Sequence, residues 1–188
     1  LCLPDKKITL EKIKCLSASH PLPDEKSVAA AERILELAGR AGEKDLLFVL
    51  ISGGGSSQAC LPAEGVSLEE KRLITAMLLK AGASIVELNT VRKHLSRIKG
   101  GRLAQAAFPA TVINLVISDV IDNDLENIAS GPSCWDSSTY ADSFRVLNKY
   151  GLWDKSPGSA REIIEKGMRG RTSETLKRED PVFKQVYN

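Results

Sequence analysis

Two short apolar runs dominate the hydrophobic pattern of the chain. Residues 46–51 read Leu-Leu-Phe-Val-Leu-Ile, and residues 112–117 read Val-Ile-Asn-Leu-Val-Ile. Near-continuous apolar character over about six residues is typical of a parallel strand whose two faces are both covered. We therefore expect two buried parallel strands, and a weaker extended stretch over residues 13–18.

The segments around these runs have the period of amphipathic helices. Val28, Ile34 and Leu35 share one face of residues 26–40, and either Asp24 or Ser27 is expected to cap this helix. Further helices are predicted over residues 84–97, from about residue 100, and over residues 139–150 and 159–165, the last two with Ser or Thr caps.

Ser67 and Glu70 have the spacing of a capping box, which starts another helix at residue 68. Its period places Leu73, Met77 and Leu78 inward. Strands that alternate with helices predict an α/β fold, a three-layer Rossmann-like domain with a mostly parallel sheet. Ligands bind at the carboxyl ends of the strands in such sheets, and the polar motifs of this chain lie there.

Composition restricts the class of protein only broadly. The net charge of +2 is too close to balance to favour nucleic acid or a membrane surface, and no apolar run approaches the roughly 20 residues of a membrane span. No signal peptide is expected. The cysteines form no CxxC pair, and we expect Cys60 to be a buried apolar residue in a reducing, cytoplasmic compartment.

A glycine-rich motif follows the first predicted strand. Its glycines permit positive φ angles, and converging amides with two hydroxyls would suit a phosphate. The alternative is a tight strand-to-helix turn without a ligand. No Gly-Lys-Ser/Thr follows, and Gln58 stands where a dinucleotide fingerprint needs its third glycine. The candidate binding residues are Ser52, Gly53, Gly54, Gly55, Ser56 and Ser57.

A basic segment lies between the two strands. On a helix, Arg92, Ser96 and Lys99 would share one face. Lys99 and Arg102 flank two glycines, and a helix that begins there could hold an anion. The alternative is a solvated basic face. The positions expected to pack inward are Val91, Leu95 and Ile98.

Acidic residues follow the second strand. Asp119 and Asp124 offer hard oxygen ligands for Mg²⁺, and one carboxylate could instead orient or deprotonate an attacking hydroxyl. The alternative is an acidic loop with Asx-turns. A few residues on, Ser130 and Gly131 precede a proline in a rigid turn that would present a hydroxyl and backbone amides, unless it is an ordinary loop.

In this order, the blocks HPLPDE, LISGGGSS, ISDV, IASGP, LNKYGL and SETLKRED resemble the glycerate 2-kinase family whose last domain is called MOFRL. The resemblance implies phosphorylation of D-glycerate to 2-phosphoglycerate with ATP and Mg²⁺, in a cleft between a Rossmann-like domain and the MOFRL domain. Residues 1–188 would then be an incomplete piece of a larger two-domain protein. The lysine of a Gly-Lys-Ala block and an arginine of the MOFRL domain would lie outside it, leaving the piece alone inactive.

The resemblance also suggests roles for the candidate residues. The glycine motif would bind phosphate or the glycerate carboxylate, and the three cations named above would neutralise the moving phosphoryl group. Asp119 would contact Mg²⁺ or orient the hydroxyl, with Asp124 second. The partners would be glycerate and a nucleotide, with a homodimer possible. The alternatives are a non-catalytic anion-binding or dimerising fragment, and an NAD(P)H-dependent hydroxypyruvate reductase.

Overall fold

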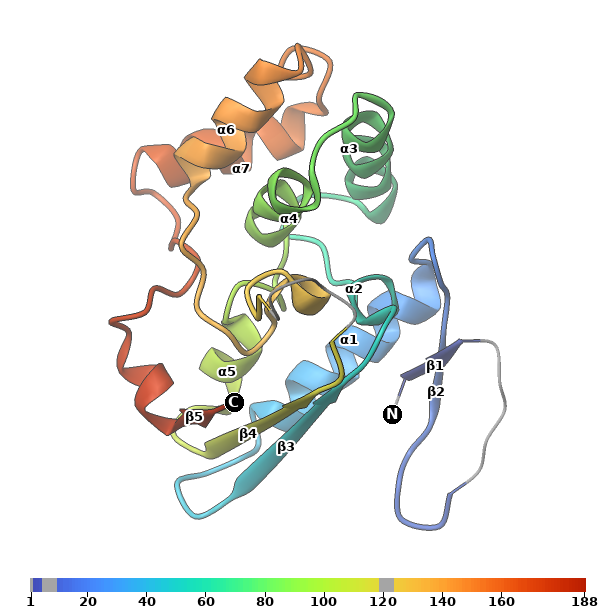
Figure 1. Ribbon diagram of the computed structural model, residues 1–188, viewed down its shortest axis with the longest axis vertical. Coiled ribbons are helices and arrows are strands. Elements are labelled where there is room, and N and C mark those ends of the chain that lie inside the picture. Colours follow the sequence, from blue (N-terminus) through green and yellow to red (C-terminus); the bar gives the residue numbers. More distant parts are fainter. Residues whose placement is uncertain (1, 5–9, 119–123) are drawn as a thin grey trace.

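A three-stranded parallel sheet forms one part of the molecule. The computed structural model describes the backbone of residues 2–4 and all of residues 10–118 and 124–188 (Figure 1). The strands β3 (Leu46–Ile51), β4 (Thr111–Val116) and β5 (Val186–Tyr187) lie in the order β3-β4-β5. Ile51 pairs with Val116, so β3 and β4 end at the same edge. The two predicted strands and their parallel pairing are confirmed.

A second, two-stranded parallel sheet pairs β1 (Cys2–Pro4) with β2 (Leu16–Ala18). The extended stretch expected before the first helix is therefore a strand only over its last three residues.

Two helices cover one face of the larger sheet. They are α1 (Glu25–Ala38) and α5 (Arg102–Ala107), and Figure 1 shows α1 running alongside β3 and β4. Asp24 and Ser27 form a reciprocal capping box at the start of α1, so both residues named as possible caps take part. Small residues let these helices approach the sheet closely. A hydrophobic cluster fills the space between the helices and the sheet, and its buried residues are Ala31, Ala38, Leu61, Ile98, Leu103, Ala107 and Val112.

The opposite face of the sheet is open. Leu47 and Val49 point to the helices, whereas Leu46, Phe48 and Leu50 are 51%, 55% and 70% exposed. Side chains alternate between the faces of a strand, and no element of the described residues packs on the outer face of β3. The expectation that both faces are covered is therefore wrong for this strand.

Four helices form a second cluster above the sheet in Figure 1. They are α3 (Leu68–Lys80), α4 (Ile85–His94), α6 (Tyr140–Lys149) and α7 (Gly158–Met168). Capping boxes start three of them, at Ser67, Ser84 and Thr139. Their buried residues include Ile74, Leu78, Leu88, Val91, Leu95, Tyr140, Leu147 and Ile164.

Three details of the helices differ from the prediction. Leu73 is 49% exposed, and its neighbour Ile74 takes the inward position. Pro157 precedes α7, with no side-chain cap. The helix expected to reach residue 97 ends at His94. None of the helices in the described part is long and apolar enough to cross a membrane.

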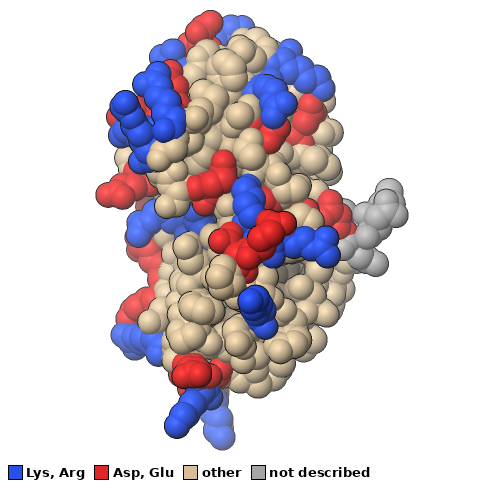
Figure 2. Space-filling model, turned by 90° about the vertical axis from the view of Figure 1, so that its left-hand side faces the viewer, with Lys and Arg blue, Asp and Glu red and all other residues tan. Residues whose placement is uncertain are grey.

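The remaining elements are short. They are α2 (Gly55–Gln58), η2 (Ile128–Ser130) and η3 (Pro181–Gln185). Lys and Arg side chains are interspersed with Asp and Glu over the face shown in Figure 2, with no continuous patch of one sign there.

Candidate functional site

The glycine motif forms the turn from β3 to α2, at the carboxyl edge of the sheet. Gly54 has φ 84°, and a Cβ atom there would lie 2.9 Å from Cδ2 of His20. A side chain at this position would be strained and crowded, so the tight turn requires glycine. Ser52 and Gly53 are exposed, while Ser56 is half-buried. Ser57 is buried and donates a hydrogen bond to the Gly54 carbonyl oxygen (3.0 Å).

Lys99 reaches the glycine turn from the other side. Because α4 ends at His94, Ser96 and Lys99 lie beyond the helix, and the expected shared face with Arg92 does not exist. The side chain of Lys99 is buried. Its Nζ donates hydrogen bonds to the Ser56 carbonyl oxygen (2.9 Å), the Ser56 hydroxyl (3.2 Å) and the Ala129 carbonyl oxygen (3.2 Å).

Burial changes the acid–base behaviour of this lysine. Loss of hydration lowers the pKa of Lys99 from 10.5 to about 7; Cys60 opposes this shift, and the nearby cations Lys71 and Arg92 add to it. No ion pair of the described residues involves Lys99. The lysine is therefore a group that can lose its proton near neutral pH.

The turn around Ser130 completes this part of the site. Ala129, Ser130 and Gly131 have φ angles of 50°, 62° and 56°. Left-handed conformation at two non-glycine residues is strained, at a cost of order 1 kcal/mol each. The backbone N–H groups of Gly100 and Gly101 hold the turn through the carbonyl oxygens of Ser130 (3.2 Å) and Gly131 (2.8 Å).

A buried polar network joins the two turns. The hydroxyl oxygens of Ser56 and Ser130 are 3.0 Å apart, and Ser130 donates to Asn89 Oδ1 (3.0 Å). Asn89 Nδ2 donates to both the backbone carbonyl oxygen and Oδ1 of Asn127 (3.1 Å each). Asn127 Nδ2 donates to Asp124 Oδ2 (2.6 Å).

Sequence reasoning missed both asparagines of this network. The available signal was a polar residue on the apolar face of a helix, since Asn89 follows buried Leu88 and lies two positions before buried Val91. A buried amide needs hydrogen-bond partners, and such a position indicates a polar network.

The other two predicted cations have different surroundings. Arg102 donates from Nη1 to the carbonyl oxygens of Lys93 (3.2 Å) and Lys99 (3.3 Å). Arg92 is half-buried, and burial lowers its pKa. Among the described residues, no hydrogen bond or ion pair involves the Arg92 guanidinium.

A further buried lysine, Lys71, was not predicted. Its Nζ donates to the carbonyl oxygens of Leu95 (2.5 Å) and Arg92 (3.1 Å). These bonds satisfy carbonyl groups at the C-terminal end of α4. Burial lowers the pKa of Lys71 to about 8.

Only part of the acidic segment is described. Asp119 lies outside the described residues. Asp124 is exposed and also accepts from the Glu126 backbone N–H (3.1 Å). Within residues 10–118 and 124–188, no three His, Cys, Asp or Glu side chains gather as a metal site.

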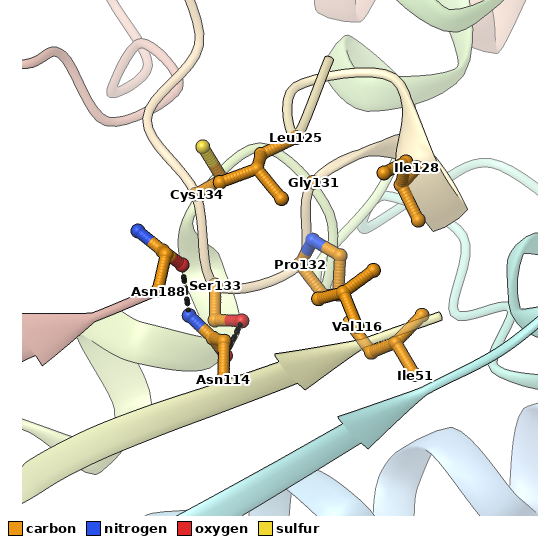
Figure 3. A pocket seen from close by; sticks show the side chains of 10 residues that line it. All are labelled: Ile51, Asn114, Val116, Leu125, Ile128, Gly131, Pro132, Ser133, Cys134 and Asn188. Atoms are coloured by element: carbon orange, nitrogen blue, oxygen red, sulfur yellow. Dashed lines mark hydrogen bonds between the residues drawn. The ribbon is translucent and has the colours of Figure 1, made fainter. Parts of the chain in front are cut away.

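A small cavity lies behind the Ser130 turn (Figure 3). Asn114 stands between Ser133 and Asn188, with Oδ1 of Asn114 accepting from Ser133 (2.5 Å) and Nδ2 donating to Asn188 (2.7 Å). The cavity volume is about 10 Å³ and the lining includes Gly131, so there is room for about one water molecule. This cavity is too small to hold a substrate.

The fold and the site define an α/β protein with a polar site at the carboxyl edge of a parallel sheet, where a glycine turn, a buried lysine and a strained serine turn meet. Residues 3–165 match the family model described as "Domain of unknown function (DUF4147)", and the chain belongs to this family.

Proteins similar to this chain carry two kinds of name. A glycerate 2-kinase of Pyrococcus horikoshii is 51% identical over 172 residues, which are 92% of this chain and 39% of that protein. A putative hydroxypyruvate reductase of Agrobacterium vitis is 48% identical over 83% of this chain and 35% of its own length. The crystal structure of a glycerate kinase from Thermotoga maritima superposes with a TM-score of 0.84 at 45% identity, over 96% of this chain and 40% of that one. This chain thus spans 35% to 40% of the length of these three relatives.

Proposed function

We propose that the polypeptide containing this chain transfers the γ-phosphoryl group of ATP to the 2-hydroxyl of D-glycerate, giving 2-phosphoglycerate. The observation that carries the proposal is the meeting of the glycine turn, Lys99 and the Ser130 turn at one edge of the sheet. The similarity to glycerate kinases supports this choice of reaction.

The glycine turn would bind phosphate or the substrate carboxylate. Ser52 and Gly53 are exposed, and no hydrogen bond among the described residues uses the backbone N–H of Gly53 or Gly54. Free backbone amides on a fixed turn are suitable donors for oxygen anions. Arg92 would add a positive charge, and fixed positive charge at a developing anion contributes several kcal/mol to such reactions.

Arg102, Ser130 and Gly131 would act mainly by keeping this turn in place. All three are tied to backbone or side-chain partners of the chain itself. A homodimer remains a proposal that the oligomeric state in solution would test.

Mg²⁺ remains the cation we expect, with Asp119 and Asp124 as candidate ligands. The described residues do not by themselves form a site for it, because no three His, Cys, Asp or Glu side chains gather among them. A divalent cation would offset phosphate charge during the transfer.

A coupled ATP assay of the complete gene product on a panel of small hydroxy acids tests the proposal. We expect turnover with D-glycerate, and the position of the phosphate in the product can be read by ³¹P NMR. Lys99→Ala and Asp119→Asn should each lower kcat at least 10-fold, whereas Lys80→Ala, at the exposed end of α3, serves as the matched control. Normal activity in both site variants would remove the assignment.

The relative named a putative hydroxypyruvate reductase favours a second candidate, reduction of hydroxypyruvate by NAD(P)H. Against this candidate, Gln58 interrupts the dinucleotide fingerprint within α2. Oxidation of NADH on addition of hydroxypyruvate, followed by the loss of NADH absorbance, would favour the reductase. The absence of any turnover in both assays would favour a non-catalytic anion-binding or dimerising module.

A further inference from the structure

The hydrogen bonds between the two turns run in one direction. Both N–H groups of the Asn89 amide are used on Asn127, so Asn89 Oδ1 is an acceptor and Ser130 must donate to it. A hydroxyl has one proton, so Ser130 can only accept from Ser56. Ser56 then accepts from Lys99.

The chain of donors therefore starts at Lys99 and ends at a carboxylate. From Asn127, Nδ2 donates to Asp124. Each donor between Lys99 and Asp124 already has its acceptor. The Ser56 hydroxyl therefore keeps one orientation while Lys99 is charged.

The three partners of Lys99 are not equivalent. The carbonyl oxygens of Ser56 and Ala129 can only accept hydrogen bonds, whereas the Ser56 hydroxyl can also donate. When Lys99 loses a proton, its two remaining N–H groups can stay on the carbonyls. The lone pair then faces the Ser56 hydroxyl.

The surroundings favour this loss of a proton. The titratable groups that face Lys99 are Lys71 from α3, Arg92 from α4 and the thiol of Cys60 after α2. Lys71 and Arg92 lower the pKa of Lys99 and Cys60 raises it, while no carboxylate of the described residues is paired with Lys99. A buried ammonium without an opposite charge is unstable relative to the neutral amine.

We propose that Lys99 accepts, through the Ser56 hydroxyl, the proton of the alcohol that becomes phosphorylated. This inference rests on the proposed function. Ser56 is half-buried and follows the exposed Ser52 and Gly53, whereas Lys99 is buried, so Ser56 is the one of the two that a bound alcohol would contact.

The proton and electron pairs balance in this step. The alcohol gives its proton to Ser56 Oγ while Ser56 turns its own proton from Ser130 to Lys99 Nζ. The alkoxide forms a bond to the γ-phosphorus of ATP, and the bond from that phosphorus to the bridging oxygen breaks, releasing ADP. Lys99, now an ammonium ion, returns the proton to solvent. Ser130 and Asn89 are positioning residues that keep Ser56 between the alcohol and the lysine.

The test combines lysine NMR with pH–rate profiles on the complete gene product. In the wild type, the ¹⁵Nζ signal of Lys99 should titrate near pH 7, and kcat with ATP and D-glycerate should rise with pH through the same midpoint. Ser56→Ala and Lys99→Met should each lose about 10²-fold or more in kcat and lose this acidic limb, as expected for loss of a general base.

Lys71→Met is the matched control, because Lys71 is also buried but bonds only to carbonyl oxygens. Its acidic limb should remain, with the midpoint at a higher pH because one cation that lowers the pKa of Lys99 is gone. If Lys99→Met does not fold, the wild type and Ser56→Ala decide. If Lys99 stays charged above pH 9, or if the acidic limb of the pH–rate profile is unchanged in Ser56→Ala, proton transfer through Ser56 to Lys99 is refuted, while the proposed function stands. A wild type with no phosphoryl transfer overturns the proposed function and this proton transfer with it.

Discussion

The stability of the protein should depend on pH through the buried lysine at its centre. Burial lowers the pKa of Lys99 from 10.5 to about 7. In the unfolded chain the same lysine keeps its ordinary pKa. Between about pH 7 and pH 10, the unfolded state therefore binds one proton more than the folded state, and the free energy of unfolding rises with pH across this window.

The size of this effect follows from linkage. One proton changes the unfolding equilibrium constant 10-fold per pH unit, which between about pH 7 and pH 9 amounts to about 3 kcal/mol. Below pH 7 both states are protonated at Lys99, and its contribution no longer changes. Lys99→Met removes the contribution while keeping an unbranched apolar side chain of similar reach.

The measurement is urea unfolding of wild type and Lys99→Met at half-unit steps from pH 6 to pH 9.5. The difference in unfolding free energy should be flat below pH 7 and then shift in favour of the wild type as pH rises. Lys71→Met provides the comparison. Burial lowers the pKa of Lys71 to about 8, so its difference should start to change about one unit higher. A wild-type minus Lys99→Met difference that is constant from pH 6 to pH 9.5 would show that Lys99 stays charged when buried, and would refute the reasoning.

Three further substitutions test the packing and polar contacts. Gly167→Ala should destabilise by at least about 2 kcal/mol, although alanine favours helices, because its Cβ would lie 2.1 Å from the ring of buried Tyr140; unchanged stability in urea unfolding would contradict this packing. Ser67→Ala removes the capping box of α3 and should cost about 1 kcal/mol, seen as a lower urea midpoint with unchanged slope. Lys93→Met leaves the Asp136 carboxylate, whose oxygen lies 2.6 Å from Nζ of Lys93, buried and unpaired, at a cost of about 3–5 kcal/mol. Adding Asp136→Asn should recover part of that loss, and no recovery would argue against the ion pair.

Local patterns in the sequence were sufficient for most elements. The strands at residues 46–51 and 112–117 and the cap at Ser67 follow from short-range rules of hydrophobic period and side-chain capping. The positive φ of Gly54 follows from the same kind of rule, since only glycine adopts it without strain. Such rules need only a few neighbouring residues.

Boundaries and faces were predicted less well. The basic segment reads as one helix through residue 97, yet the chain leaves the helix after His94 and Ser96 pairs with Pro62 in an isolated bridge. Leu73 and Ile74 are adjacent and both apolar, so periodicity alone could not decide which faces inward. The outer face of β3 is as apolar as its inner face, and only the arrangement of the helices distinguishes them.

The amino-acid sequence by itself determined the α/β class, the parallel strand pair, most helix starts and the edge of the sheet at which the polar motifs gather, because these depend on local periodicity and on the geometry of parallel strands. Only the tertiary structure decided that Lys99 is buried against Ser56 and Ala129, and that Asn89 and Asn127 connect it to Asp124. Lys99 lies 43 positions from Ser56 and 30 from Ala129, and Asn89 lies 38 positions from Asn127. The pKa of Lys99 depends on the loss of hydration at that meeting point, which no local sequence pattern encodes.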